Sequence, residues 1–269
     1  MGLLADHGQK DTLLERLERS LEWSLGADYG APVLENSNDK ARHDRLNHRL
    51  VAEQMRRQQN IETIIAMAYR KAESGPEIQN DAASVHDDWM AHFLDFSGMI
   101  GDEDMQAVWA DVLVRETAGP GQFSYGTLQK LSTLTPQQMD LCRRLVRLSF
   151  PTGLLFKLAR PVDMDAFGLL SEHIEQLKNL DLLWKDDDLN VSFLAPSKGL
   201  TLDFTGADLV FRHPERELFT FHVYKLTDAG RELTLLMQDG PVDPDYLKAL
   251  GLFMKSEGYD FRLKIKNEE

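Results

Sequence analysis

One short segment carries the residue types that bind divalent metals or transfer protons. Asp88, His92 and Asp95 follow one another at i, i+4 and i+7, which places them on one face of a helix. Such a face can ligate a divalent cation or act in acid–base catalysis. A structural explanation competes, because Asp88 suits the start of a helix while Trp89 and Phe93 suit its packed side. A fourth ligand is not identifiable. We therefore predict no metal site and no cofactor. If a metal were bound, Asp88, His92 and Asp95 would be the candidate ligands.

The motifs of common enzyme classes are missing from the rest of the chain. Residues 119–122 are not followed by the Gly-Lys-Ser/Thr of a phosphate-binding loop. Ser171, Glu172 and His173 are adjacent, which is not how a catalytic triad is recognised, and no Gly-x-Ser-x-Gly elbow occurs. The single cysteine, Cys142, lies among apolar neighbours and is predicted to be buried filler. We predict that the protein is not an enzyme.

A second group of candidate functional residues is cationic. Residues 40–71 hold eight Lys and Arg against three acids, whereas residues 77–116 hold ten acids and one Arg. We expect these two segments to neutralise each other, within one chain or between subunits. A contact between the basic segment and a nucleic acid is the alternative. The cations that would contact a partner or a nucleic acid are Arg42, Arg45, Arg49, Arg56 and Arg57, together with Arg212 and Arg216 near the C-terminus.

The overall charge disfavours generic binding to nucleic acids or anionic membranes. The chain has 269 residues, with 30 Lys and Arg against 44 Asp and Glu, which gives a net charge of −14. No apolar run approaches the length of a membrane-spanning helix, and the first residues do not resemble a signal peptide. We expect a cytoplasmic protein of bacterial type without a membrane partner.

The elements that must position these residues are mainly helical. A leucine stripe over residues 11–25 predicts a helix, and a Gly- and Pro-containing linker follows to residue 36. Residues 37–74 lack Gly and Pro, which predicts a helical arm about 55 Å long. Its first half is mostly polar and its second half is apolar. We therefore expect the second half to dock on the protein and the first half to project from it.

The remaining chain is predicted as a helical domain over residues 75–150 and an α+β domain over residues 151–269. Asp102, Ser124 and Thr135 are the expected helix starts of the first domain. The second domain should contain a helix over residues 165–180, several short strands of which the first covers residues 182–184, and a final helix and strand over residues 243–265. Three aspartates at residues 186–188 are expected to form a solvated turn. The fold class is mainly α with an α+β C-terminal domain.

Three stretches carry a resemblance to known families. They are Arg57–Glu62, residues 88–135 with their Met-Gln-Ala-Val-Trp-Ala and Pro-Gly-Gln-Phe-Ser-Tyr-Gly runs, and Tyr224–Leu233 followed by Tyr246, Leu247, Leu250 and Gly258. Together they resemble bacterial proteins of domain-of-unknown-function family 2806 and a related gammaproteobacterial family. The resemblance spans roughly residues 55–260 and implies no particular activity. The stretch Leu226–Gly230 is also similar to the Leu-Thr-x-x-Gly helix start at the end of winged-helix domains, which implies a winged-helix-like C-terminal domain.

Three functional hypotheses follow. The first is an interaction or regulatory protein that assembles through the helical arm, with itself or with another protein. The second is a nucleic-acid-binding regulator that uses the winged-helix-like domain. Its recognition helix would lie near Ser171–Asn179, which holds two acids and one lysine. The third is a component of phage defence or another stress response, and it rests only on association with the family.

Overall fold

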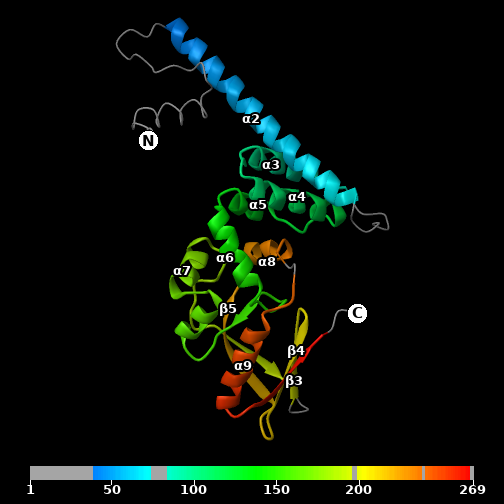
Figure 1. Ribbon diagram of the computed structural model, residues 1–269, viewed down its shortest axis with the longest axis vertical. Coiled ribbons are helices and arrows are strands. Elements are labelled where there is room, and N and C mark those ends of the chain that lie inside the picture. Colours follow the sequence, from blue (N-terminus) through cyan, green and yellow to red (C-terminus); the bar gives the residue numbers. More distant parts are fainter. Residues whose placement is uncertain (1–38, 74–83, 196–198, 238–239, 267–269) are drawn as a thin grey trace, which may run out of the picture.

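The computed structural model describes residues 39–73, 84–195, 199–237 and 240–266. The predicted helix over residues 11–25 and its linker lie outside the described residues. The first helices are α2 (Asp39–Glu73), α3 (Asp87–Ser97), α4 (Glu103–Ala118), α5 (Tyr125–Leu131) and α6 (Pro136–Val146). In Figure 1, α2 extends away from the other helices at one end of an elongated molecule, and the sheets lie at the opposite end. Among the described residues, no helix combines the length and apolar character that a membrane span requires.

Side-chain caps start these helices at the predicted positions. Asp102 accepts a hydrogen bond from the Met105 N–H at 3.0 Å, and Ser124 caps α5. Thr135 caps α6 in a reciprocal capping box, with Pro136 in the first turn. At α3 the structure corrects the expectation that Asp88 would start the helix. The cap is His86, whose Nδ1 accepts the Asp88 N–H at 3.2 Å.

An aromatic cluster forms the core of the helical region. The ring of Phe93 lies 5.3 Å from Trp89 and 5.4 Å from Trp109, and all three side chains are buried. The Trp89 indole donates a hydrogen bond to the Phe123 carbonyl at 2.7 Å, which ties α3 to the loop before α5. Glu116 is buried in the same region and accepts the N–H groups of Gly121 and Phe123. The turn after α4 is therefore held by a carboxylate.

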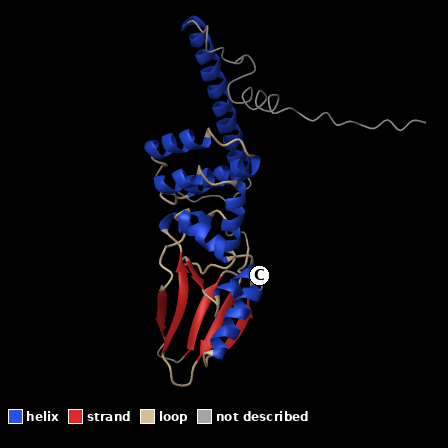
Figure 2. Cartoon of the chain, turned by 90° about the vertical axis from the view of Figure 1, so that its left-hand side faces the viewer, coloured by secondary structure: helices blue, strands red, loops and turns tan. Residues whose placement is uncertain are grey.

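The described residues of the C-terminal part form two antiparallel sheets and four helices, in agreement with the predicted α+β character (Figure 2). The first sheet has the order β1-β5-β2 and the second has the order β3-β4-β6. The strands are β1 (Leu154–Phe156), β2 (Asn190–Leu194), β3 (Gly199–Phe204), β4 (Ala207–Arg212), β5 (Leu218–Lys225) and β6 (Asp260–Ile265). The helices are η1 (Pro161–Phe167), α7 (Ser171–Asn179), α8 (Asp228–Leu235) and α9 (Pro244–Ser256).

Phenylalanine side chains join the two sheets into one core. The Phe156 ring of β1 lies 5.0 Å from Phe221 in the same sheet and 5.9 Å from Phe204 of the second sheet. Helix α9 is anchored to β1 because the buried Tyr246 hydroxyl donates a hydrogen bond to the Phe156 carbonyl at 2.7 Å. Burial raises the pKa of Tyr246 far above its usual value, so the phenol stays protonated.

Three local expectations for this region were wrong. The helix predicted over residues 165–180 is broken, because Gly168 has φ +76° and ends η1 before α7 begins at Ser171. Residues 182–184 form only an isolated bridge between Leu183 and Leu226 instead of a strand. Strand β1 was not predicted. It is three residues long, and its pairing with β5 defines it more than its own sequence does.

Candidate functional site

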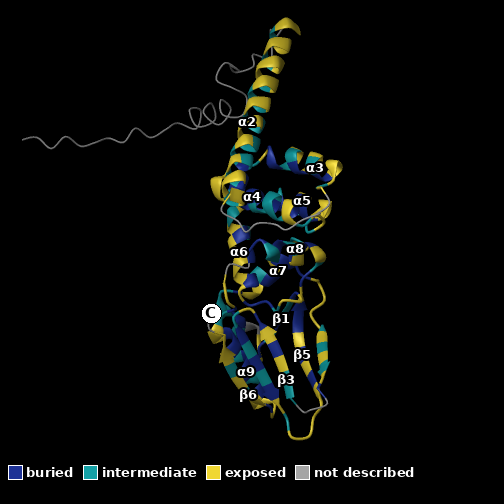
Figure 3. Cartoon of the chain, turned by 90° about the vertical axis from the view of Figure 1, so that its right-hand side faces the viewer, coloured by how far each residue is buried: buried dark blue, intermediate teal, exposed yellow. Residues whose placement is uncertain are grey.

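Helix α2 docks on the protein with its C-terminal half, as predicted. Its buried residues are Ile64 and Ala68. The N-terminal half, residues 39–56, carries mostly exposed side chains (Figure 3). Leu46 and Leu50 are each 42% exposed there, and Val51 and Met55 are 63% and 67% exposed. We call residues 39–56 the projecting half of α2. Its exposed apolar side chains make it the candidate assembly surface.

The docked half is joined to the acidic segment by specific polar contacts. Arg57 Nη2 donates to the Asp95 carboxylate at 2.5 Å and to the Asp95 carbonyl at 2.9 Å. Lys71 forms an ion pair of 2.6 Å with Asp111 on α4. Asn60 donates a hydrogen bond to the Gly98 carbonyl at the end of α3. The basic and acidic segments thus meet within one chain at these two ion pairs.

The docking face of α2 continues into the projecting half. Leu46 precedes the buried Ile64 by 18 residues, which is five helical turns, and Leu50 precedes Ala68 by the same distance. Both leucines therefore lie on the same face of α2 as Ile64 and Ala68, the face that is buried in the docked half. Six residues share this face and form what we call the complementary stripe: Asp39, Arg42, Leu46, Leu50, Glu53 and Arg57.

The structure distributes the predicted cationic residues over two distant regions. Arg42, Arg45, Arg49 and Arg56 lie on the projecting half of α2, where Arg42 pairs with Asp39 at 3.4 Å and Arg49 pairs with Glu53 at 3.5 Å. Arg57 belongs to the docked contact with Asp95. Arg212 ends β4 opposite Asp260, and Arg216 follows in the loop before β5. Helix α2 and strand β4 lie at opposite ends of the molecule (Figure 1).

The candidate metal residues are engaged separately. The His92 ring packs 4.9 Å from Tyr125 and 6.2 Å from Phe96. Asp95 pairs with Arg57, and the Asp88 carboxylate lies 3.7 Å from His86 in an exposed position. Within the described ranges, no group of three His, Cys, Asp or Glu is arranged to hold a metal ion. Cys142 is buried as predicted, and burial raises the pKa of its thiol to about 12.

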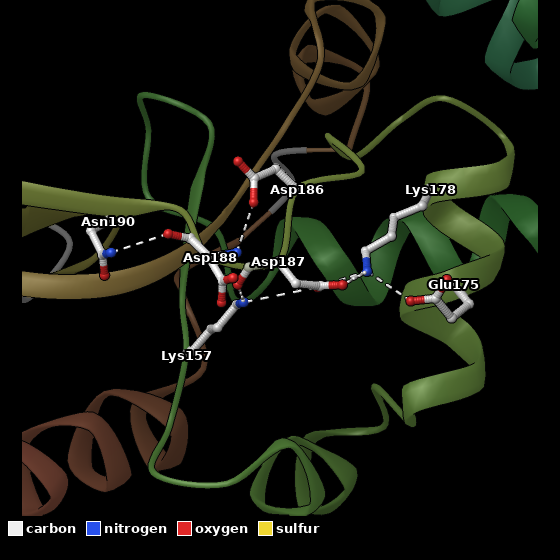
Figure 4. Close-up of polar contacts among 7 residues, drawn as sticks. All are labelled: Lys157, Glu175, Lys178, Asp186, Asp187, Asp188 and Asn190. Atoms are coloured by element: carbon white, nitrogen blue, oxygen red, sulfur yellow. Dashed lines mark hydrogen bonds and ion pairs between the residues drawn. The ribbon is translucent and has the colours of Figure 1, made fainter.

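A buried lysine that the sequence did not reveal holds α7 to the acidic turn before β2 (Figure 4). The Lys178 side chain is 5% exposed, and its Nζ lies 2.7 Å from Glu175 and from both carboxylate oxygens of Asp187. Burial alone would lower the pKa of Lys178. The hydrogen bonds to Asp187 and Glu175 outweigh this effect and raise it. The aspartate turn is solvated, as expected, because residues 186–188 are all exposed, but Asp187 also has a structural role.

Lys157, which follows β1, lies beside this cluster. Its ammonium group is 4.0 Å from the centre of the Tyr224 ring and 4.0 Å from the Asp187 carboxylate, and it donates to the Asp187 carbonyl. Partial burial lowers the pKa of Lys157, and the neighbouring charge of Lys178 adds to this effect, while Asp187 opposes it. Lys157 therefore carries its charge in a partly desolvated position.

The comparison with protein families identifies the chain. A family model described as a protein of unknown function (DUF2806) matches residues 44–154 and 151–251. The chain belongs to this family. The DUF2806 match begins within the projecting half of α2 and ends within α9, so it includes both the helical region and most of the α+β region. No curated protein and no solved structure gave a match.

Proposed function

We propose that this protein is an interaction protein that assembles through the projecting half of α2, with a second copy of the chain as its partner. One observation carries this proposal. The face that docks α2 on α3 and α4 continues toward its N-terminus, where Leu46 and Leu50 remain exposed. A helix that extends its apolar face beyond its own domain is suited to packing against another chain.

The complementary stripe favours a second copy in antiparallel orientation. From its N-terminal end, the stripe has the pattern acid, base, leucine, leucine, acid, base. When a second copy runs in the opposite direction, Arg42 faces Glu53 of the partner subunit and Leu46 faces Leu50 of the partner subunit, while Arg57 keeps its contact with Asp95. A two-fold symmetric interface needs this kind of self-complementary surface. The leucines would supply most of the affinity, because an exposed ion pair contributes only about 0–1 kcal/mol.

Light scattering on the full chain tests this proposal. We expect the wild-type mass to be that of a dimer and the double variant Leu46→Glu, Leu50→Glu to be a monomer, because four carboxylates would then meet at the centre of the interface. Val51→Glu is the matched control, since Val51 is exposed on the same half of α2 but lies outside the stripe. A monomeric wild type, or a double variant that remains dimeric, would contradict the proposal.

For the C-terminal region we propose a winged-helix arrangement that contacts a protein rather than reads a duplex. The succession of α6, β1, α7, β2 and β5, with the sheet order β1-β5-β2, supports this arrangement. Strands β3 and β4 would then lie in an enlarged wing. Helix α7 occupies the place of a recognition helix, but its exposed face carries Glu172 and Glu175. Its lysine, Lys178, is held by carboxylates.

A mobility-shift experiment distinguishes this role from the nucleic-acid alternative. We expect no shift of duplex DNA at low salt, because the exposed carboxylates of α7 would face the phosphates and repel them. The double variant Glu172→Lys, Glu175→Lys serves as the comparison, since it tests whether charge alone prevents binding. A shift with the wild-type chain that is lost in Arg212→Ala, Arg216→Ala would instead support the nucleic-acid alternative.

A further inference from the structure

A groove of about 880 Å³ lies beside β5, on the far side of the molecule from the arm. Its walls come from the segment after β1, from β5 and the loop before it, and from the C-terminal end of α9. This volume falls in the range of pockets that hold small molecules. The residues that matter for the argument are Lys157, Arg160, Arg216, Tyr224, Tyr259 and Glu257.

Two cations in this groove rest on aromatic rings. Lys157 Nζ lies 4.0 Å from the centre of the Tyr224 ring. The guanidinium group of Arg216 lies 5.6 Å from the centre of the Tyr259 ring and donates a hydrogen bond to the Tyr259 hydroxyl at 3.3 Å. Contacts with aromatic rings position a cation without neutralising its charge. The positive charge of both side chains therefore remains available to a ligand.

Lys157 has a carboxylate only at the outer limit of ion-pair distance, because that carboxylate is hydrogen-bonded to another lysine. Asp187 directs both of its carboxylate oxygens to Lys178 at 2.7 Å and lies 4.0 Å from Lys157. The Arg216 guanidinium group hydrogen-bonds the Tyr259 hydroxyl, and the charges of Glu257 and Glu215 act on it. Arg160, at the rim, is paired with Asp163 at 2.7 Å. Lys157 and Arg216 are thus the groups that an incoming anion would meet in the groove.

We infer that this groove binds a small anion joined to a planar ring, the chemistry shared by nucleotides and aromatic carboxylates. The anionic group would pair with Lys157 and Arg216, and the ring would pack on the accessible apolar side chains that line the same groove, Leu218 and Phe253. A bound anion would also offset the cost of holding the partly buried Lys157 in its charged form. This inference concerns a surface remote from α2 and does not depend on the proposed assembly.

Titration calorimetry on the full chain tests the inference with four probes. These are ADP, 4-hydroxybenzoate, adenosine as a ring without the anion, and pyrophosphate as an anion without the ring. We expect ADP or 4-hydroxybenzoate to bind saturably and to bind more tightly than adenosine and pyrophosphate. Tighter binding of ADP would assign a nucleotide, and tighter binding of 4-hydroxybenzoate would assign an aromatic carboxylate.

Variants of the groove provide the second readout. We expect Arg216→Ala and Lys157→Met each to weaken binding roughly tenfold or more, because each removes a charge-assisted hydrogen bond. Glu257→Gln should strengthen binding, since it removes a negative charge from the groove, and an improvement cannot arise from misfolding. Arg262→Ala is the matched control, because Arg262 is exposed on β6 and does not line the groove.

Several results would overturn the inference. It fails if neither ADP nor 4-hydroxybenzoate binds to the wild-type chain. It also fails if 4-hydroxybenzoate does not bind and adenosine binds as tightly as ADP. The anionic group would then contribute nothing to the affinity. Equal affinities in Arg216→Ala, Glu257→Gln and Arg262→Ala would place any binding outside this groove.

Discussion

Replacing Asp187 by alanine should lower the free energy of unfolding by about 1.5 kcal/mol. Asp187 accepts two hydrogen bonds from Lys178, whose side chain is 5% exposed, and its loss would leave a buried ammonium group with Glu175 alone. A hydrogen bond to a charged group contributes about 1.5–3 kcal/mol, and here the Asp187 side chain is itself 58% exposed. We expect the lower end of this range because Glu175 remains. Urea denaturation followed by circular dichroism measures the change.

Two further variants isolate the cause. Asp188→Ala removes an exposed carboxylate from the same turn and should change the free energy of unfolding by less than about 0.5 kcal/mol. The double variant Asp187→Ala, Lys178→Met should recover most of the loss, because it removes the uncompensated charge. If Asp187→Ala were as stable as Asp188→Ala, or if the double variant were no more stable than Asp187→Ala, the structural role of this ion pair would be refuted.

The second large effect concerns the charge pattern on α2. Arg42→Glu should weaken the proposed dimer about 30-fold, because the new carboxylate would then face Glu53 of the partner subunit. By two-fold symmetry this repulsion occurs twice, and each site changes from attraction to repulsion, for a total of about 2 kcal/mol. A dilution series followed by analytical ultracentrifugation measures the dissociation constant.

A charge exchange supplies the control for this experiment. Glu53→Arg alone should weaken the dimer to a similar degree, whereas Arg42→Glu combined with Glu53→Arg should restore it, since opposite charges would meet again. Glu and Arg have similar helix propensities, so these exchanges leave α2 helical. Single variants that dimerise like the wild type would argue against the antiparallel pairing. So would a double variant that remains as weak as the single ones.

The long helix shows how far local sequence reasoning reached. The absence of Gly and Pro over residues 37–73 predicted one uninterrupted helix, and the structure has α2 over Asp39–Glu73. The change from polar to apolar side chains correctly indicated which half docks. The caps at Asp102, Ser124 and Thr135 were also predictable, because a cap joins residues only two or three positions apart.

The functional residues of the C-terminal region were harder to predict. Lys178 was counted as the single cation of a possible recognition helix, yet it is buried against Asp187, nine residues later. The sequence did not predict that Lys157 and Arg216 act together, because 59 positions separate them. Arg216 was predicted only as a contact for a partner or a nucleic acid. The antiparallel pairing of β1 with β5 brings their segments to one groove. A charge count along the chain contains no such information.

The sequence by itself determined the helices, their caps, the docked half of α2 and the membership in the DUF2806 family, which the family match supports. These properties depend on neighbours a few residues apart or on the succession of residues along the chain. Only the tertiary structure decided which charges are neutralised and which face a groove. Lys178 and Lys157 both lie near Asp187, but Lys178 hydrogen-bonds its carboxylate at 2.7 Å whereas Lys157 lies 4.0 Å from it. The difference arises from burial and from strand pairing between distant segments, because the strength of a charge interaction depends on the distance and the solvent that the fold imposes.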